Sequence, residues 1–234
     1  MARSKRKVTP LIVHEKPKST VSEKFRGIRS NIMFSNANEE IESVLISSEK
    51  PSSGKSTVSA NLAITYAQAG YKTLVIDGDM RKPTQHYLFN LSNQSGLSNL
   101  IIGKVIKKDA IKSTQVDNLD VLTAGPVPPN PSELIGSQRF EELFQQLIAE
   151  YDFIVIDTPP VNTVTDAQLY AQLVENCILV IDNEKNDRKE IIKAKELLEK
   201  SHGKVIGAVL NRTKVEKNSS YYYYYGDEGN DWYT

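Results

Sequence analysis

Residues 43–57 read SVLISSEKPSSGKST, and this stretch decides the fold class. Its first part, Ser43–Ser47, is a β-rich apolar run, and its last part, Gly54–Thr57, opens a segment of helical composition. A strand, a loop of small residues and a helix start, in that order, is the context that a phosphate-binding loop requires, because backbone N–H groups at a helix N-terminus attract phosphate. The stretch therefore predicts a nucleotide site.

Two residues of this loop have expected chemical roles. Lys55 is expected to neutralise charge on the β- and γ-phosphates, and the Ser56 hydroxyl is expected to ligate Mg²⁺. Glu49 stands where the usual pattern has its first glycine, so the spacing departs from that pattern. The loop residues predicted to bind nucleotide are Ser52, Ser53, Gly54, Lys55, Ser56 and Thr57.

Strand and helix signals alternate along the 234 residues, which are enough for one sizeable α/β domain. Strands without apolar–polar alternation, separated by amphipathic helices, predict a mostly parallel sheet with helices on both faces, the architecture of a P-loop NTPase. The expected strands are Ser43–Ser47, Thr73–Asp77, Asn118–Thr123, Phe153–Asp157, Cys177–Ile181 and Val205–Leu210. The expected helices are Val21–Met33, Lys55–Ala69, Phe140–Glu150 and Lys189–Lys200.

The sequence divides into three parts. Residues 1–19, rich in Lys and Pro, are expected to form a basic irregular arm, and residues 20–213 the nucleotide-binding domain. Residues 214–234 are expected to be a mobile, low-complexity tail. The first helix of the domain has capping-box spacing between Thr20 and Glu23. Its apolar stripe consists of Val21, Phe25, Ile28 and Ile32.

Three aspartates stand at the ends of expected strands. Asp157 closes one strand and has the position of a Walker B carboxylate, which holds Mg²⁺ through its water shell. Asp77 and Asp79 end a second strand and suit a metal and a general base near a γ-phosphate. Asp77-Gly78-Asp79 is also ordinary turn chemistry. Its occurrence together with the phosphate loop and Asp157 favours the site.

The tail contains an unbroken run of five tyrosines, Tyr221–Tyr225, and a further one, Tyr233. Five consecutive tyrosines also suit an aromatic strand, but the flanking Gly, Asn, Asp and Glu residues do not favour packing. A flexible tail presents many hydroxyls to an active site at low ordering cost. We therefore interpret Tyr221, Tyr222, Tyr223, Tyr224, Tyr225 and Tyr233 as phosphate acceptors.

Composition argues against several classes of protein. A formal net charge of zero argues against nucleic-acid binding, and no apolar run approaches the ~20 residues that span a bilayer. Cys177, the single cysteine, lies in an apolar run and is expected to be a buried thiol, which fits a reducing, cytoplasmic compartment. The three histidines are too scattered for a metal site.

These motifs, in this order, resemble the bacterial tyrosine kinase (BY-kinase) family, and closely its CapB/CpsD-type cytoplasmic kinases of capsule synthesis. The resemblance runs from about Pro17 to the C-terminus. It is carried by 23–31 (EKFRGIRSN), 48–57, 77–83 (DGDMRKP), 125–134, 157–160 (DTPP) and the tyrosine tail.

The resemblance implies a function and residue roles. It makes 48–57 the Walker A loop, places Asp77 and Asp79 in a second motif called Walker A-prime, and makes Asp157 the Walker B carboxylate. It implies that Asp77 orients or deprotonates a tyrosine hydroxyl, and that Asp79 and Asp157 support Mg²⁺ and the phosphate network. The predicted metal residues are Ser56, Asp77 and Asp157. Lys55, Asp77, Asp79 and Asp157 are then the catalytic set, with ATP and Mg²⁺ as cofactors. Asn211 is implied to contact the adenine, although a turn-forming Asn is equally compatible with its position.

It also implies partners. The pattern of Glu23, Arg26 and Arg29 is linked in the family to ring-shaped self-assembly, which brings one subunit's tail to the next subunit's site; a solvated helix face is the alternative. A separate transmembrane adaptor is implied to activate the kinase and to recruit it to the inner face of the cell membrane. The implied process is regulation of capsular or exopolysaccharide synthesis.

Two other functions remain open from sequence. Lys50 lies where ParA/MinD-type ATPases have a signature lysine, but Pro51 and Ser52 replace the glycines that follow it, and we interpret Lys50 as a solvated loop residue. An ATPase of that type leaves the tyrosine run unexplained. A nucleotide-dependent scaffold without phosphotransfer is the third possibility.

Overall fold

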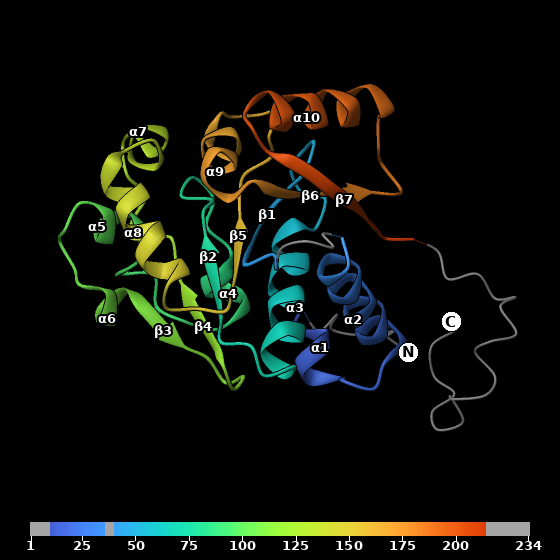
Figure 1. Cartoon of the computed structure of the whole chain (residues 1–234), viewed down its shortest axis with the longest axis horizontal. Helices are drawn as coiled ribbons and strands as arrows, with labels where there is room; N and C mark the ends of the chain where they lie inside the picture. Colours follow the sequence, from blue (N-terminus) through green and yellow to red (C-terminus); the bar gives the residue numbers. More distant parts are fainter. Residues whose placement is uncertain (1–9, 36–39, 214–234) are drawn as a thin grey trace, which may run out of the picture.

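The computed structural model describes residues 10–35 and 40–213, and a seven-stranded sheet runs through the middle of these residues (Figure 1). The strand order is β3-β4-β2-β5-β1-β6-β7, and neighbouring strands are parallel except for β3 and β4. This confirms the predicted fold class. The strands are β1 (Ser43–Ser47), β2 (Thr73–Asp77), β3 (Ile111–Ser113), β4 (Leu119–Leu122), β5 (Phe153–Asp157), β6 (Asn176–Asp182) and β7 (Lys204–Asn211).

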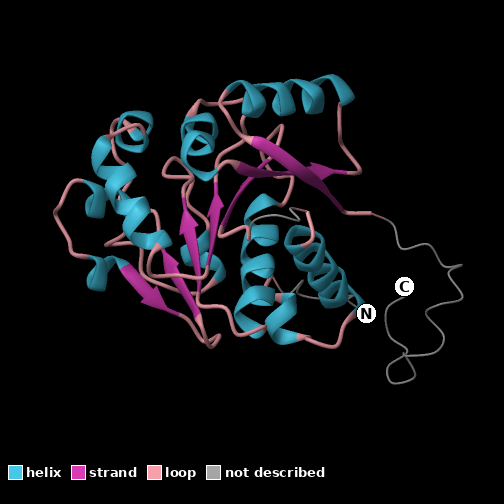
Figure 2. Cartoon of the chain, viewed as in Figure 1, coloured by secondary structure: helices cyan, strands magenta, loops and turns pink. Residues whose placement is uncertain are grey.

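Helices cover both faces of the sheet, and each face has its own apolar core (Figure 2). On one face pack α1 (Ile12–Glu15), α2 (Thr20–Met33), α3 (Lys55–Gln68) and the region of α4 (Gln85–Leu88). On the other face pack α5 (Leu97–Ile101), α6 (Lys107–Ala110), α7 (Pro131–Ile135), α8 (Gln138–Ile148), α9 (Asp166–Val174) and α10 (Arg188–Lys200).

The central strands are apolar throughout because both of their faces are buried. Every residue of β1, β2 and β5 is buried, which explains why their sequences lack the alternation of a half-exposed strand. β2 pairs with β5 in a register that places Asp77 beside Asp157. Parallel pairing therefore brings the polar residues at the carboxyl ends of these strands to one edge of the sheet, as α/β nucleotide-binding folds require.

Most predicted elements are confirmed, with ends displaced by one or two residues. Where helices start earlier than predicted, the reason is a side-chain cap: Ser137 accepts a hydrogen bond from the Phe140 N–H before α8, and Asp187 accepts one from the Lys189 N–H before α10. Sequence analysis does not predict β3, the short helices α4, α5, α6 and α7, or α9. β3 has three residues, too few for a periodic signal.

The expectation of an irregular arm over residues 1–19 is wrong for its second half. Ile12–Glu15 form a helical turn, and Leu11 and Val13 are buried in the core beneath α2 and α3. The side chain of Asn61 on α3 fixes this segment: its Oδ1 accepts from the Val13 N–H (3.0 Å), and its Nδ2 donates to the Pro10 carbonyl (2.7 Å). The folded domain therefore begins by residue 10.

The predicted capping box at α2 is also wrong, by one residue. Ser19 is the N-cap, and its hydroxyl accepts from the Ser22 N–H (3.2 Å), so Thr20 is already helical. The stripe is displaced at its first position, because Val21 is 43% exposed whereas Ser22 is fully buried. Ser22 faces the preceding segment and donates its hydroxyl to the Lys16 carbonyl (2.7 Å).

Two further sequence predictions concern burial and membranes. Cys177 is buried on β6, which confirms the expected core thiol. Burial raises the pKa of its thiol to about 12. Within residues 10–35 and 40–213, none of the helices combines the length and hydropathy needed to cross a bilayer.

Leu11→Ala tests whether the residues before α2 belong to the core. Leu11 is 2% exposed, so we expect the free energy of unfolding to fall by about 3 kcal/mol. Glu15→Ala, at an exposed position of the same turn, should change it by no more than about 0.5 kcal/mol. Urea denaturation of both variants makes the comparison. Equal, negligible effects would support the irregular arm instead.

Candidate active site

The loop between β1 and α3 is braced by its own serines. The hydroxyls of Ser48 and Ser53 both donate to the carbonyl of Lys50, at 2.7 and 3.1 Å. Ser52 has φ 64°, a left-handed conformation in which glycine is more usual. The Ser53 hydroxyl, at a position where glycine is frequent, therefore supplies a hydrogen bond that glycine lacks.

Gly54 and Asn211 fit against each other at the start of α3. Gly54 has φ 93°, and a Cβ at this position would lie 2.1 Å from Asn211 Nδ2. Asn211, at the end of β7, donates from Nδ2 to the Ser53 carbonyl (2.9 Å). Its neighbour Arg212 donates to the Ser52 carbonyl (3.1 Å) and pairs with Asp182. The end of β7 thus holds the outer side of the phosphate loop.

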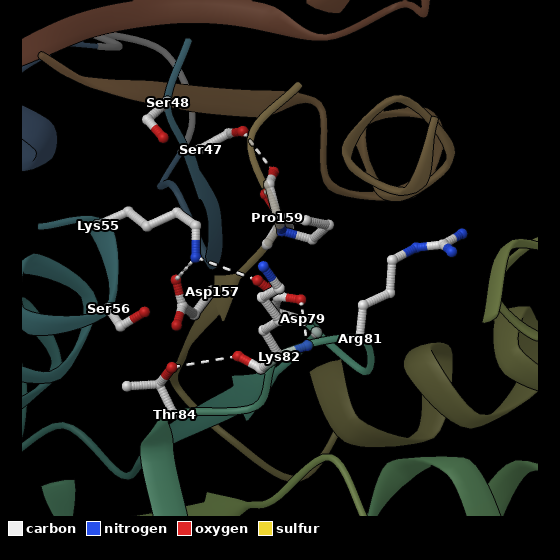
Figure 3. Close-up of polar contacts among 12 residues, drawn as sticks. Ser47, Ser48, Lys55, Ser56, Asp79, Arg81, Lys82, Thr84, Asp157 and Pro159 are labelled. Carbon is white, nitrogen blue, oxygen red and sulfur yellow. Dashed lines mark hydrogen bonds and ion pairs between the residues drawn. The ribbon is translucent and has the colours of Figure 1, made fainter. Parts of the chain in front are cut away.

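Lys55 lies between two aspartates. Its Nζ is 3.3 Å from Asp79 Oδ2 and 3.7 Å from Asp157 Oδ1, and Figure 3 shows its side chain reaching between them, with Ser56 close by. Burial by itself lowers the pKa of the Lys55 ammonium, but the charges of Asp157 and Asp79 outweigh burial and raise it. Lys55 is therefore held as a buried cation.

Asp77 and Asp157 lie side by side at the ends of β2 and β5, and both are fully buried. Burial and the neighbouring charge of Asp157 raise the pKa of Asp77 well above that of an exposed aspartate. Two backbone donors oppose this shift: the N–H groups of Thr84 and Gln85 both lie 2.9 Å from Asp77 Oδ2. Asp77 is thus oriented through one oxygen while remaining a better proton acceptor than an exposed carboxylate.

Gly78 allows the two strands to approach this closely. Its N–H donates to the Asp157 carbonyl (2.8 Å). A Cβ at residue 78 would lie 2.9 Å from that carbonyl oxygen and 3.0 Å from the Tyr170 ring. Glycine is therefore needed between the two aspartates of the DGD motif because backbone and ring fill the space.

Asp79 and Arg81 hold the loop after β2 through hydrogen bonds to two different places, one within the loop and one on α9. Asp79 Oδ1 accepts from the Lys82 N–H (3.0 Å), which turns the chain back toward Lys55 (Figure 3). Arg81 extends the other way and pairs with Asp166 at the start of α9, with Nε and Nη2 at 2.8 and 3.0 Å from the carboxylate. The Ser132 hydroxyl completes this group, donating to Asp166 at 2.7 Å. Such a bidentate arginine pair fixes orientation as well as distance.

The oxygens at this edge suit Mg²⁺. Asp77 Oδ1 and Asp157 Oδ1 are buried and have no hydrogen-bond donor, so each has a lone pair to offer a cation or its water. The described residues contain no cluster of three or more His, Cys, Asp or Glu side chains arranged for a metal. Mg²⁺ does not require one, because it usually binds through one or two carboxylates together with waters and substrate phosphates. The residues therefore fit a magnesium–phosphate site.

One central residue was missed by sequence reasoning. Gln85 is fully buried, and its Nε2 donates to Asp157 Oδ2 (2.9 Å) and to the Ser56 carbonyl (3.1 Å). No sequence pattern marks it, because a glutamine at the start of a four-residue helix has no characteristic spacing to the other motifs. Only the folded chain brings Gln85 to the aspartates.

The remaining predicted site residues lie apart from this group or outside the described residues. Glu23 and Arg26 pair with each other on α2, and Arg29 donates to the Thr65 carbonyl on α3. Lys50 lies 3.6 Å from Glu49, and its side chain is 34% exposed. Thr57 is exposed on the first turn of α3. The tail residues Tyr221, Tyr222, Tyr223, Tyr224, Tyr225 and Tyr233 lie outside the described residues.

The chain is similar to named bacterial kinases over nearly its full length. It is 69% identical over 97% of its residues to the whole of CapB from Staphylococcus aureus, which is provisionally named a tyrosine-protein kinase. It is 42% identical over 92% of its residues to 90% of the tyrosine-protein kinase YwqD from Bacillus subtilis. The family described as AAA domain matches residues 41–187.

Solved structures agree with the sequence relatives. The chimerical protein CapA2B2 has a TM-score of 0.86 and 57% identity, over 88% of this chain and 91% of the other. The kinase domain of the Escherichia coli tyrosine kinase ETK has a TM-score of 0.85 and 33% identity, over 94% and 86%. Both exceed the likeness to MinD from Pyrococcus horikoshii, solved with Mg-ADP, at a TM-score of 0.62 and 28% identity over 72% and 69%.

The P-loop fold is common to all of these structures, whereas high identity over nearly the whole chain is found with the kinases. The loop before Lys55, the DGD motif and Asp157 meet at one edge of the sheet, in the order and register described above. On these grounds, the chain belongs to the family of bacterial tyrosine-protein kinases.

Proposed function

We propose that this chain transfers the γ-phosphoryl group of MgATP to tyrosine hydroxyls, chiefly those of its own C-terminal tail. The observation that supports this best is the position of Lys55, a buried cation within 4 Å of Asp79 and Asp157 at the first turn after a phosphate loop. Phosphoryl transfer needs little covalent chemistry from the protein, because positioning and charge neutralisation provide most of the acceleration.

The phosphates of the nucleotide are bound by backbone N–H groups of the loop and by the side chain of Lys55. Backbone N–H groups of 52–57 surround the β-phosphate, and Lys55 exchanges part of its pairing with Asp79 and Asp157 for the β- and γ-phosphates. Ser56 and the oxygens of Asp157 and Asp77 that lack a hydrogen-bond donor would hold Mg²⁺, which when bound would neutralise charge on the transferring group.

Asp77 receives the proton of the acceptor tyrosine. A free tyrosine hydroxyl has a pKa near ~10, so it is protonated at neutral pH. Its oxygen forms a bond to the γ-phosphorus as the bond to the β–γ bridging oxygen breaks, ADP leaves, and the proton passes to Asp77. The raised pKa of Asp77 supports this role, because a general base works best when its pKa lies near the working pH.

The acceptors are Tyr221, Tyr222, Tyr223, Tyr224, Tyr225 and Tyr233. Each phosphate adds roughly −1.5 to −2 charge at neutral pH, to a tail that already carries Asp227, Glu228 and Asp231. An increasingly anionic tail is repelled by the phosphates of bound ATP and by the carboxylates of the site. Modification therefore favours departure of the tail.

Assembly and partners extend the proposal. Glu23, Arg26 and Arg29 form an interface in a ring of identical chains, so that one subunit modifies the tail of the next. Because Arg26 and Glu23 already pair and Arg29 already bonds to α3, assembly has to work through the parts of these side chains that remain exposed.

A transmembrane adaptor activates the kinase and recruits it from the cytoplasm to the membrane, and the pathway regulated is capsular or exopolysaccharide synthesis. The kinship with CapB- and CpsD-type proteins supports this part of the proposal.

Intact-mass spectrometry after incubation with MgATP tests the reaction. We expect a ladder of up to six phosphates on the full chain, one for each tail tyrosine, and none on a truncation before Tyr221. Lys55→Met should slow phosphate incorporation by roughly 10²–10³-fold, since it removes a preorganised charge at the transferring group. A candidate adaptor segment is added in a parallel reaction, so that an unactivated kinase is not mistaken for an inactive one. ATP hydrolysis without any phosphate on the protein would support the ATPase alternative.

Asp77→Asn and Asp157→Asn separate proton transfer from metal binding. Asp77→Asn should lower kcat by roughly 10²–10⁴-fold, because it removes the general base. Asp157→Asn should raise the Mg²⁺ concentration needed for half-maximal nucleotide binding by roughly tenfold or more, because changes at groups around a bound metal lower metal affinity to that extent. Steady-state kinetics over a Mg²⁺ titration measures both. If Asp77→Asn instead left kcat unchanged and raised only KM, as a metal residue alone would, Asp77 would not be the general base.

A further inference from the structure

Gln85 touches every motif of the nucleotide site. Its side-chain Nε2 donates to Asp157 in the Walker B motif and to the carbonyl of Ser56 in the phosphate loop. Its backbone N–H donates to Asp77 in the DGD motif. One residue, fully buried, thus ties three segments that lie far apart in the sequence.

The orientation of the Gln85 amide follows from its partners. Both groups that Nε2 contacts, a carboxylate oxygen and a carbonyl oxygen, are acceptors, so the nitrogen has to lie on that side. The amide oxygen, Oε1, therefore has to occupy the other side of the amide group. Oε1 is buried and has no hydrogen-bond donor.

The acceptor oxygens around Gln85 divide into two groups. Asp77 Oδ2 and Asp157 Oδ2 both accept hydrogen bonds from Gln85, and these oxygens fix the two carboxylates. The other oxygen of each carboxylate and Oε1 of Gln85 are buried acceptors without donors. Asp77 Oδ1 and Gln85 Oε1 have no hydrogen-bond donor, and Asp157 Oδ1 has only the Lys55 ammonium, 3.7 Å away. Such buried acceptors are unusual, because nearly all buried polar atoms in native proteins are hydrogen-bonded to protein or water.

A hydrated divalent cation would supply these oxygens with a positive charge and with water hydrogen-bond donors. Carboxylate oxygens are ligands that Mg²⁺ prefers, whereas a neutral amide oxygen suits a hydrogen bond from one of the waters that Mg²⁺ retains. Groups around a metal site that orient its ligands in this way affect metal affinity strongly.

We propose that Gln85 is a positioning residue of the metal–nucleotide site: its amide nitrogen holds Asp157 against the phosphate loop, and its amide oxygen accepts a hydrogen bond from a cation-bound water. The inference rests on the proposed function, because it takes Asp77, Asp157 and Ser56 as the residues that hold Mg²⁺ beside the nucleotide. It adds a residue that lies outside the recognised motifs.

Binding of the fluorescent nucleotide mant-ADP to the full chain, titrated with Mg²⁺, tests this role without turnover. In Gln85→Leu we expect the Mg²⁺ concentration for half-maximal binding to rise roughly 10–100-fold, while binding in EDTA stays as in the unmodified chain. Gln168→Leu is the matched control, because its amide oxygen contacts Ser201 on α10's C-terminal side and none of the site residues. It should leave the titration unchanged.

Gln85→Met keeps the length of the side chain without its polar atoms, and it serves if the leucine variant does not fold. Urea denaturation in EDTA shows whether each variant is folded. A residue that merely tied α4 to the sheet would alter stability and nucleotide binding to the same extent with and without Mg²⁺. An unchanged Mg²⁺ midpoint in a folded Gln85 variant overturns the positioning role alone. Absence of Mg²⁺-dependent binding in the unmodified chain overturns the proposed function and this role together.

Discussion

The buried charge of Lys55 is the constraint on which the site depends. A single ammonium group lies within 4 Å of carboxylates from two different segments, Asp79 in the loop after β2 and Asp157 at the end of β5. Buried charges are tolerated only when they are paired, and the aspartates stabilise the charged form of the lysine. The parallel register of β2 and β5, the absence of a side chain at Gly78 and the left-handed turn at Gly54 all serve to bring these charges together.

The rest of the edge holds these charges in place with neutral donors. The Lys82 N–H donates to Asp79, and the N–H groups of Thr84 and Gln85 share one oxygen of Asp77. The side-chain amide of Gln85 donates to Asp157. Arg81 also connects the loop after β2 to α7 and α9, because it donates to Ser132 and to Asp166, which bond to each other. A site fixed in advance has little reorganisation left to perform when charge moves during phosphoryl transfer, which is the main source of electrostatic catalysis.

Sequence reasoning succeeds where a physical requirement is local. The apolar strands, the loop before Lys55 and the aspartates at strand ends follow from burial on both faces and from the needs of phosphate binding, and the structure has them in the expected order. It fails where the requirement lies between distant segments. The contact of Asn61 with the chain at Pro10, the burial of Ser22 in place of Val21, and Gln85 all depend on packing partners that no spacing reveals.

The loop that follows β2 has one further property. Asp77 binds the backbone N–H groups of Thr84 and Gln85, seven and eight residues later, and Asp79 binds that of Lys82. The donors of these bonds are backbone N–H groups, so the bonds do not depend on the side chains of Lys82 and Thr84 but do depend on how many residues lie between. At such positions the segment can vary in composition more readily than in length, because a single deletion or insertion separates the aspartates from their donors, whereas surface loops elsewhere tolerate such changes.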